Sequence, residues 1–197
     1  MSVRIVLAGD STVTDSEGWG LGFAASLGQG FEIINLAQGG RSSKSFRDEG
    51  HWQKCLDAKG DWLLIQFGHN DCPGKGPERE TNPHTTYREN LSRFVDEARA
   101  ASSKPVLITS MARRYWTSSG RNDVDVLSLY AHAVWTVAGE KNVPLIDLYR
   151  LSINEYESKG QAAWKALSPS DTDITHLNAA GGQIIGRIVA DEFRRFL

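Results

Sequence analysis

Five short runs of apolar residues recur along the chain, and each ends at glycine or polar residues. Each run is too short for a typical helix and is rich in Ile, Leu or Val, which is typical of a strand buried on both faces. The pattern therefore predicts five strands of a single parallel sheet. The five runs are Val3–Ala8, Glu32–Leu36, Trp62–Phe67, Val106–Ser110 and Val143–Leu148.

The segments between these runs predict helices that connect one strand to the next. In one of them Leu91, Phe94, Val95 and Ala98 repeat at the spacing of a single helix face. The last predicted helix is preceded by Asn178, a favourable N-cap. The predicted helices are Trp19–Leu27, Ser42–Leu56, Tyr87–Ala101, Val124–Glu140 and Ala179–Phe196.

Strands that alternate with helices predict the α/β class, with helices on both faces of the sheet. Five strands favour a three-layer α/β/α arrangement with the flavodoxin-like strand order 2-1-3-4-5. At 40% hydrophobic and 23% charged residues, the 197 residues can bury a core of their own. The sequence contains no repeat, low-complexity tract or linker, so we expect residues 1–197 to form one domain.

The net charge, the start of the sequence and the cysteine content indicate which partners, which compartment and which state of the cysteines to expect. A formal net charge of -2 argues against nucleic acid or an anionic membrane as a partner bound through bulk charge. The chain enters its first strand without the basic and apolar prelude of a secretory signal, so we expect a cytoplasmic protein, or a secreted or periplasmic one whose signal was removed. Cys55 and Cys72 are too few for a disulfide framework and lack metal-binding spacing, so we expect two free thiols.

Two polar segments follow strands and are predicted to be loops at the carboxyl edge of the sheet. Cys72–Thr86 contains three prolines and two glycines and follows the third strand. Arg113–Asp123 follows the fourth strand. Loops in this position commonly carry binding function.

The first strand ends in Gly9-Asp10-Ser11-Thr12, which places a hydroxyl at the edge where ligands bind in open α/β sheets. Ser11 is therefore a candidate nucleophile, although Ser11 or Thr12 could instead cap a helix. A serine nucleophile needs a base, and His176 lies three residues after Asp173. An Asp at this spacing can accept the Nδ1 proton of the imidazole and leave Nε2 facing a serine. The alternative is a simple turn cluster.

Two further turns could supply hydrogen-bond donors for an oxyanion. Gly40 follows the second strand, and a glycine lets a backbone N–H approach a ligand closely. Asn70 follows the third strand, so its amide would face the same edge. Each could instead be a tight turn that needs Gly or Asn.

Four sequence blocks, taken in order, resemble the SGNH (GDSL-type) hydrolases. They are Gly9-Asp10-Ser11, Gly40, Gly68-His69-Asn70-Asp71 and Asp173-x-x-His176. Finer features resemble the rhamnogalacturonan acetylesterases and related carbohydrate esterases, and they are Thr12, Gly18-Trp19-Gly20, Gly40-Arg41-Ser42-Ser43-Lys44-Ser45-Phe46 and Thr175-His176. The Cys72–Thr86 insertion and the loop after the fourth strand depart from the family pattern and should shape the substrate groove.

The resemblance implies a serine esterase that removes O-acetyl groups from acetylated pectic polysaccharide or oligosaccharide through an acyl-enzyme. Ser11 would attack, His176 held by Asp173 would transfer the proton, and Ser11, Gly40 and Asn70 would form the oxyanion hole. No metal or organic cofactor is implied. Alternatives are an esterase of acetylated xylan or another carboxylic ester, and a carbohydrate-binding protein without catalysis.

Several side chains are candidates for substrate contact. Arginine suits bidentate contacts with the uronate carboxylates of pectin, and a tryptophan can stack on a sugar ring. Each arginine could instead be solvated or ion-paired. The candidates are Arg41, His69, Arg113, Arg114 and Trp116.

Overall fold

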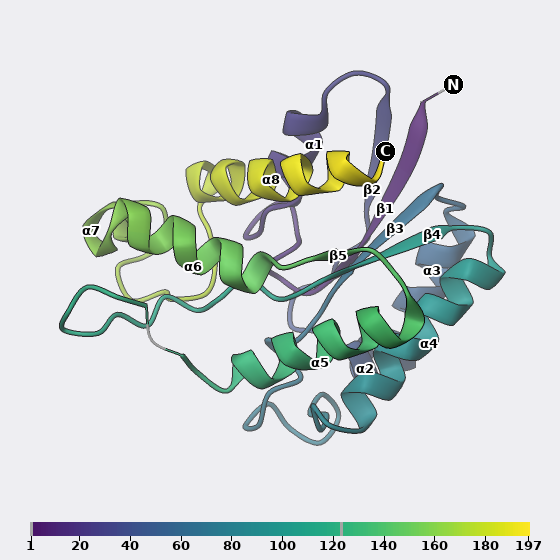
Figure 1. Ribbon diagram of the computed structural model, residues 1–197, viewed down its shortest axis with the longest axis horizontal. Helices are drawn as coiled ribbons and strands as arrows, with labels where there is room; N and C mark the ends of the chain where they lie inside the picture. The colour runs from purple at the N-terminus through teal and green to yellow at the C-terminus, as the bar shows by residue number, and fades with distance from the viewer. Residues whose placement is uncertain (1, 123) are drawn as a thin grey trace.

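The computed structural model describes residues 2–122 and 124–197 and contains one parallel sheet of five strands (Figure 1). The strand order is β2-β1-β3-β4-β5, as the sequence predicts. Asp123, the last residue of the predicted loop after the fourth strand, lies outside the described residues. The strands are β1 (Val3–Gly9), β2 (Phe31–Asn35), β3 (Trp62–Gln66), β4 (Lys104–Ile108) and β5 (Leu145–Ile146).

Helices cover both faces of the sheet, which confirms the three-layer prediction. One face packs against α1 (Gly20–Leu27), α6 (Leu148–Lys159), α7 (Gln161–Ala166) and α8 (Ala179–Phe193). The other face packs against α2 (Ser43–Asp48), α3 (His51–Asp57), α4 (Thr86–Ala100) and α5 (Leu127–Lys141). A short 3₁₀ turn, Arg194–Phe196, follows α8.

Two predicted elements differ from the structure, and two helices of the structure were not predicted. The predicted helix Ser42–Leu56 is two helices, because Gly50 has a φ of 77° and ends the first one. The strand predicted over Val143–Leu148 has only two residues in β5, and Leu148 already begins α6. Helices α6 and α7 were not predicted at all. These differences lie outside the strand ends that carry the candidate site.

The nucleophile segment leaves the sheet at its centre. β1 pairs with β2 on one side and with β3 on the other, and Gly9 is its last residue. A Cβ at Gly9 would lie 2.4 Å from Val13 Cγ2 and 2.8 Å from the Gln66 carbonyl oxygen. Only glycine therefore fits where the chain turns out of the sheet and places Ser11 at the carboxyl edge.

Close contact between α1 and α8 brings the end of the chain to the same edge. A Cβ at Gly22 would lie 2.2 Å from the Gly182 carbonyl oxygen, and one at Gly186 would lie 2.3 Å from the Phe23 nitrogen. The backbone N–H of Leu177, just before α8, donates to the Glu17 carbonyl at 2.9 Å. These contacts hold the residue after His176 against the segment that follows Ser11.

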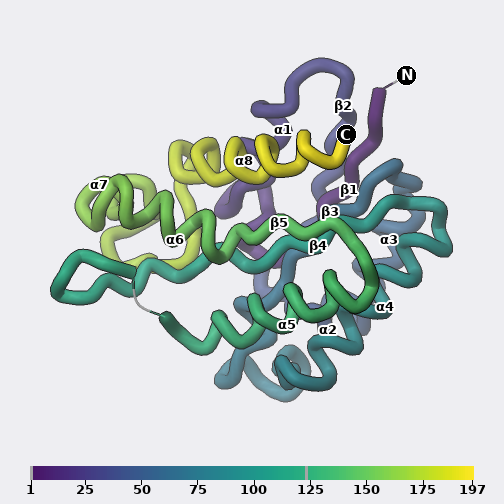
Figure 2. The backbone as a smooth tube through the Cα atoms, in the orientation of Figure 1, coloured from purple at the N-terminus to yellow at the C-terminus, as the bar shows by residue number. Residues whose placement is uncertain are grey.

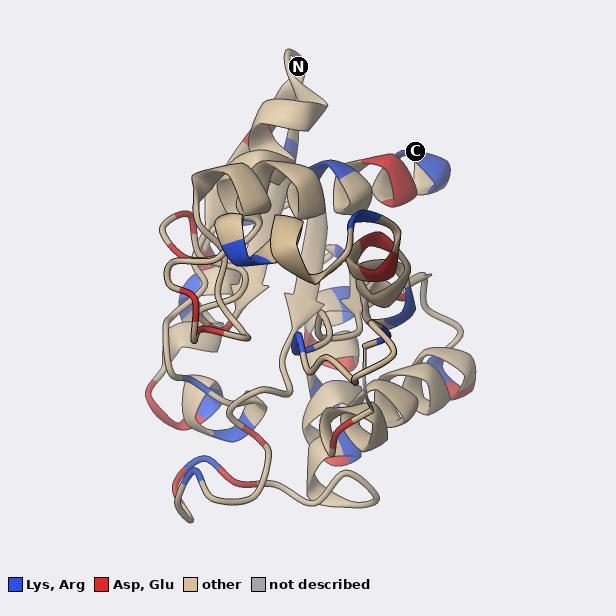
Figure 3. Cartoon of the chain, turned by 90° about the vertical axis from the view of Figure 1, so that its left-hand side faces the viewer, with Lys and Arg blue, Asp and Glu red and all other residues tan. Residues whose placement is uncertain are grey.

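The loops after the strands leave the sheet on one side, at the left of Figure 2, where the segment after β4 also extends. Figure 3 looks onto this side and shows basic and acidic residues interspersed over the elements. Among the described residues, none of the helices has the length and apolar character needed to cross a membrane.

Candidate active site

Ser11 is held in a tight turn directly after β1. The Asp10 carboxylate accepts hydrogen bonds from the Thr12 backbone N–H at 2.9 Å and from the Thr12 hydroxyl at 2.7 Å. The Val13 N–H donates to the Asp10 carbonyl at 3.1 Å and closes the turn. Ser11 itself is 8% exposed and lines a cavity. Ser11 and Thr12 do not cap the helix that follows, because Trp19 occupies the N-cap position of α1.

The structure brings together the three residues predicted to act in proton transfer. Ser11 Oγ lies 3.0 Å from His176 Nε2, and His176 Nδ1 lies 3.0 Å from Asp173 Oδ2. The other oxygen of Asp173 accepts from the backbone N–H groups of Thr175 at 2.8 Å and His176 at 2.7 Å. The carboxylate therefore fixes the loop with one oxygen and orients the imidazole with the other.

The Asp173 carboxylate is stabilised in its charged form. Burial raises its pKa, but the N–H groups of His176 and Thr175 and the His176 ring outweigh burial, so the pKa lies below its ordinary value. A carboxylate that stays ionised favours the Nδ1–H tautomer and leaves Nε2 free to accept a proton from Ser11.

The two predicted donors of the oxyanion hole lie at the same edge. Gly40 is the third residue of a turn that the Arg41 N–H closes onto the Gln38 carbonyl, and its φ of 76° lies in the left-handed region that favours glycine. A Cβ on the preceding Gly39 would lie 3.8 Å from Ser11 Cβ, so this turn runs beside the nucleophile. The Asn70 side chain donates to the Arg41 carbonyl at 3.3 Å, which joins the two donor segments.

Asp71 ties the segments around Asn70 and Gly40 to the core. Its carboxyl accepts from the Ser43 hydroxyl at 2.5 Å and from the Thr81 hydroxyl at 2.9 Å. Its backbone carbonyl accepts from the Tyr130 hydroxyl at 2.9 Å. Burial raises the pKa of Asp71 to about 7, although the hydrogen bonds from Ser43 and Thr81 oppose the shift. Sequence reasoning missed this role, because an Asp after Asn70 is equally typical of a turn.

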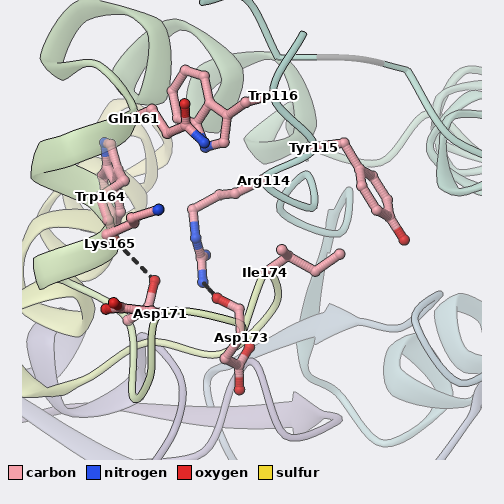
Figure 4. Close-up of a pocket in the computed structure, with 10 residues that line it drawn as sticks. Arg114, Tyr115, Trp116, Gln161, Trp164, Lys165, Asp171, Asp173 and Ile174 are labelled. Carbon is pink, nitrogen blue, oxygen red and sulfur yellow. Dashed lines mark hydrogen bonds between the residues drawn. The ribbon is translucent and has the colours of Figure 1, made fainter. Parts of the chain in front are cut away.

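Arg114 holds the loop that carries Asp173 and His176. Its guanidinium donates to the backbone carbonyls of Asp173 at 3.1 Å, Thr175 at 3.5 Å and His176 at 2.7 Å. Its backbone N–H donates to the Ile174 carbonyl at 2.8 Å. Figure 4 shows the side chain pointing at Asp173. Arg114 is 3% exposed, and its guanidinium also lies near the rings of Tyr156 and Trp164.

The residues that were predicted to contact substrate therefore lie in different parts of the structure. The Arg114 side chain donates to backbone carbonyls inside the protein, and it lines a cavity next to the one that contains Ser11. Arg41 pairs with Glu49 at 2.8 Å and is absent from the lining of the cavity beside Ser11. Trp116 lines a neighbouring cavity of about 220 Å³ that is bounded by Asp173 but not by Ser11.

His69 and Arg113, which were predicted to contact substrate, line the cavity beside Ser11. His69 is 4% exposed, and its Nδ1 lies 3.7 Å from Asp10 Oδ2. Arg113 pairs with Asp125 and donates to the His69 carbonyl at 3.4 Å. The charge of Arg113 is therefore largely balanced within the protein.

The cavity beside Ser11 has a volume of about 100 Å³ and includes two residues that were not predicted to contact substrate. They are Lys75, from the loop after β3, and Thr175, from the loop before α8. The position of the loop after β3 was predicted, but no sequence signal separates Lys75 from the other basic residues of the chain.

Neither cysteine belongs to the site. Cys55 and Cys72 are buried free thiols, as predicted. Within residues 2–122 and 124–197, no three His, Cys, Asp or Glu side chains are grouped so that they could hold a metal ion.

Comparison with known proteins supports the same chemistry. The sequence matches the GDSL-like Lipase/Acylhydrolase family over residues 7–184. It is 38% identical to a probable rhamnogalacturonan acetylesterase of Bacillus subtilis, YesY, over 96% of this chain and 92% of that protein. It is 35% identical to a second Bacillus subtilis protein, the rhamnogalacturonan acetylesterase RhgT, over 96% of this chain and 88% of the relative.

A solved structure shows the same fold at lower sequence identity. A mutant of Axe2, an acetyl-xylooligosaccharide esterase from Geobacillus, superimposes with a TM-score of 0.73 at 19% identity. The match covers 98% of this chain and 93% of that one. At this identity the likeness concerns the fold.

Proposed function

This chain belongs to the GDSL-like lipase/acylhydrolase family, and we propose that it is a serine esterase that removes O-acetyl groups from acetylated pectic polysaccharide or its oligosaccharides. The proposal rests mainly on the geometry of three side chains. Ser11 Oγ lies 3.0 Å from His176 Nε2, and His176 Nδ1 lies 3.0 Å from Asp173 Oδ2. Two relatives that match nearly the whole chain are named rhamnogalacturonan acetylesterases, which supports the pectic substrate.

In the acylation step, Ser11 Oγ attacks the carbonyl carbon of the acetyl ester while His176 Nε2 accepts the hydroxyl proton. The charge that develops on the carbonyl oxygen is stabilised by the backbone N–H groups of Ser11 and Gly40 and by the Asn70 amide. His176, now charged and held by Asp173, then donates its proton to the departing sugar oxygen. The sugar leaves with a free hydroxyl, and the acetyl group remains on Ser11.

In the deacylation step, a water molecule takes the place of the sugar. His176 accepts a proton from this water, and the resulting nucleophile attacks the acetyl carbonyl carbon. The same donors stabilise the second oxyanion, and His176 returns the proton to Ser11 Oγ as acetate leaves. Each turnover consumes one ester and one water and forms one sugar hydroxyl and one acetic acid, which ionises to acetate and a proton.

The size of the cavity beside Ser11 favours a small acyl group. Its volume of about 100 Å³ is well below that of pockets that enclose drug-sized ligands. An acetyl group fits such a cavity, whereas a long fatty acyl chain does not. The proposal therefore favours acetyl esters over lipid esters.

The experiment is a measurement of acetate release from a panel of substrates at equal ester concentration. The panel contains acetylated rhamnogalacturonan oligosaccharide, acetylated xylooligosaccharide and a long-chain acyl ester. We expect the highest kcat/KM on the first and the lowest on the last. A higher kcat/KM on the xylooligosaccharide would replace the pectic substrate with a xylan substrate, and hydrolysis of none of them would overturn the esterase.

A covalent probe separates an esterase from a protein that only binds carbohydrate. An organophosphonate that reacts with activated serines should label each chain once, at Ser11. Prior incubation with substrate should slow the labelling. A lack of labelling in the folded protein would favour the binding protein.

A further inference from the structure

Lys75 occupies a place in the catalytic cavity that the mechanism does not use. It is half-buried and lines the cavity that also contains Ser11, His176 and Asn70. It lies in the loop between β3 and α4, which contains no helix or strand. Lys75 therefore borders the cavity of the reacting groups from the long loop that follows β3.

The backbone that carries Lys75 is held in a defined turn. Gly74 and Gly76 have φ values of 88° and 96°, and their backbone N–H groups both donate to the Glu80 carboxylate at 2.8 Å. Lys44 donates from Nζ to the Pro77 carbonyl at 2.6 Å and ties the loop to α2. The hydrogen bonds of this turn therefore place Lys75 at the cavity.

Other cations near the site have partners inside the protein. Arg113 pairs with Asp125, Arg41 pairs with Glu49, and the guanidinium of Arg114 donates to three backbone carbonyls. Among the described residues, the Lys75 ammonium has no carboxylate within ion-pair distance, and Glu80 is engaged by the turn itself. The charge of Lys75 is therefore available to a ligand.

The dimensions of the cavity decide which part of a substrate meets this charge. The cavity is small, and its volume of about 100 Å³ is enough for the acetyl group. The sugar ring must then remain at the mouth of the cavity. A carboxylate on that ring, or on the neighbouring ring, can approach the Lys75 ammonium while the ester lies against Ser11.

We propose that Lys75 binds a carboxylate of the acetylated substrate and so makes the enzyme prefer acetylated uronic-acid sugars to neutral acetylated sugars. This inference rests on the proposed esterase function and adds the residue that selects the charge of the substrate. The ion pair forms with the substrate bound and favours its binding over that of a neutral analogue of the same shape.

The test compares two substrates that differ only in this charge. One is an acetylated oligogalacturonide, and the other is the same oligosaccharide with its carboxyl groups converted to methyl esters. Acetate release gives kcat/KM for both, and their ratio measures the preference for the charged sugar. In the wild type we expect a ratio well above one that falls as salt is added, because salt screens the pair.

Lys75→Met and Lys75→Gln should lower this ratio by about tenfold or more, and Lys75→Glu should bring it below one. Lys75→Arg should retain most of it. The matched control is Arg79→Met, which removes a cation from the same loop outside the cavity. The ratio for this control should equal that of the wild type.

The outcomes separate this inference from the proposed function. Hydrolysis of both substrates with a ratio that the Lys75 substitutions leave unchanged would overturn the role of Lys75 and leave the esterase intact. Failure of the wild type to release acetate from either substrate, with the protein folded, would overturn both proposals. A lowered ratio in Lys75→Met that also appears in Arg79→Met would overturn the assignment to Lys75.

Discussion

Nη2 of Arg114 donates to the backbone carbonyl of His176 at 2.7 Å, and this hydrogen bond joins two segments that are 62 residues apart in the chain. The donor is a buried cation that follows β4, and the acceptor belongs to the residue that faces Ser11. Hydrogen bonds to a charged donor are stronger than neutral ones, and a guanidinium offers several donors in fixed directions. The position of the imidazole therefore depends on a residue that does not touch the reacting atoms.

Replacement of Arg114 should lower turnover more than substrate binding. Arg114→Met should reduce kcat by about 100-fold, because a displacement of about 1 Å at a reacting group has effects of this size. KM should change by less than about threefold, since the side chain does not line the cavity beside Ser11. Steady-state kinetics on an acetyl ester measures both values.

Chemical rescue of an Arg114 variant distinguishes a positioning role of this residue from a general loss of structure. Guanidinium ions added to Arg114→Ala at low concentration should restore part of kcat, and Arg114→Lys should lie between the wild type and Arg114→Met. Arg121→Lys is the matched control, because Arg121 lies on the same segment with a side chain that is 76% exposed. Wild-type kcat in Arg114→Met would contradict the positioning role.

The Asn70 amide should stabilise the transition state and contribute little to substrate binding in the ground state. Asn70→Ala removes one donor from the developing oxyanion, so kcat should fall by about 10²–10³-fold with KM nearly unchanged. Kinetics with thermal unfolding of the same variant checks the prediction, since Asn70 also donates to the Arg41 carbonyl. A loss that appears in KM alone would show that Asn70 binds substrate and does not stabilise the oxyanion.

Asp71 should make stability depend on pH in a window set by its raised pKa. Its pKa is about 7 in the folded protein, against an ordinary value of 3.8. Between these values the unfolded chain has released a proton that the folded protein keeps. The free energy of unfolding should therefore fall as pH rises from about 4 to 7 and show no further effect of Asp71 above that range.

Asp71→Asn should remove this dependence, because the amide stays neutral at every pH. The difference in unfolding free energy between wild type and variant should therefore decrease from pH 4 to pH 7 in denaturant titrations. Asp57→Asn, at an exposed position of α3, is the control and should give a constant difference over that range. A constant difference for Asp71→Asn as well would contradict the raised pKa.

The order of the sheet could be predicted because each strand is a short apolar run that ends at a polar turn. Where local signals conflict, prediction failed. Apolar positions continue through Phe46 and Leu56, so the break at Gly50 between α2 and α3 was not visible. β5 is only two residues long. The predicted strand extended to Leu148, which is the first residue of α6.

The predicted reacting groups come together because each lies at or just beyond a strand end or next to a helix start, positions that the fold brings to one edge. The surrounding side chains could not be placed in this way. The direction of the Arg114 guanidinium depends on carbonyls in the 173–176 loop, and the access of Lys75 to the cavity depends on a turn closed by Glu80. Such contacts between distant segments leave no periodic pattern in the sequence.

Replacement of the proposed nucleophile, Ser11→Ala, is the decisive experiment for the acetylesterase. Acetate release from acetylated rhamnogalacturonan oligosaccharide should be measured for this variant and for Ser16→Ala, an exposed serine close by in the chain. We expect kcat to fall by about four to six orders of magnitude in Ser11→Ala and to stay at the wild-type value in Ser16→Ala. A folded Ser11→Ala protein with more than a tenth of the wild-type kcat would contradict this role of Ser11.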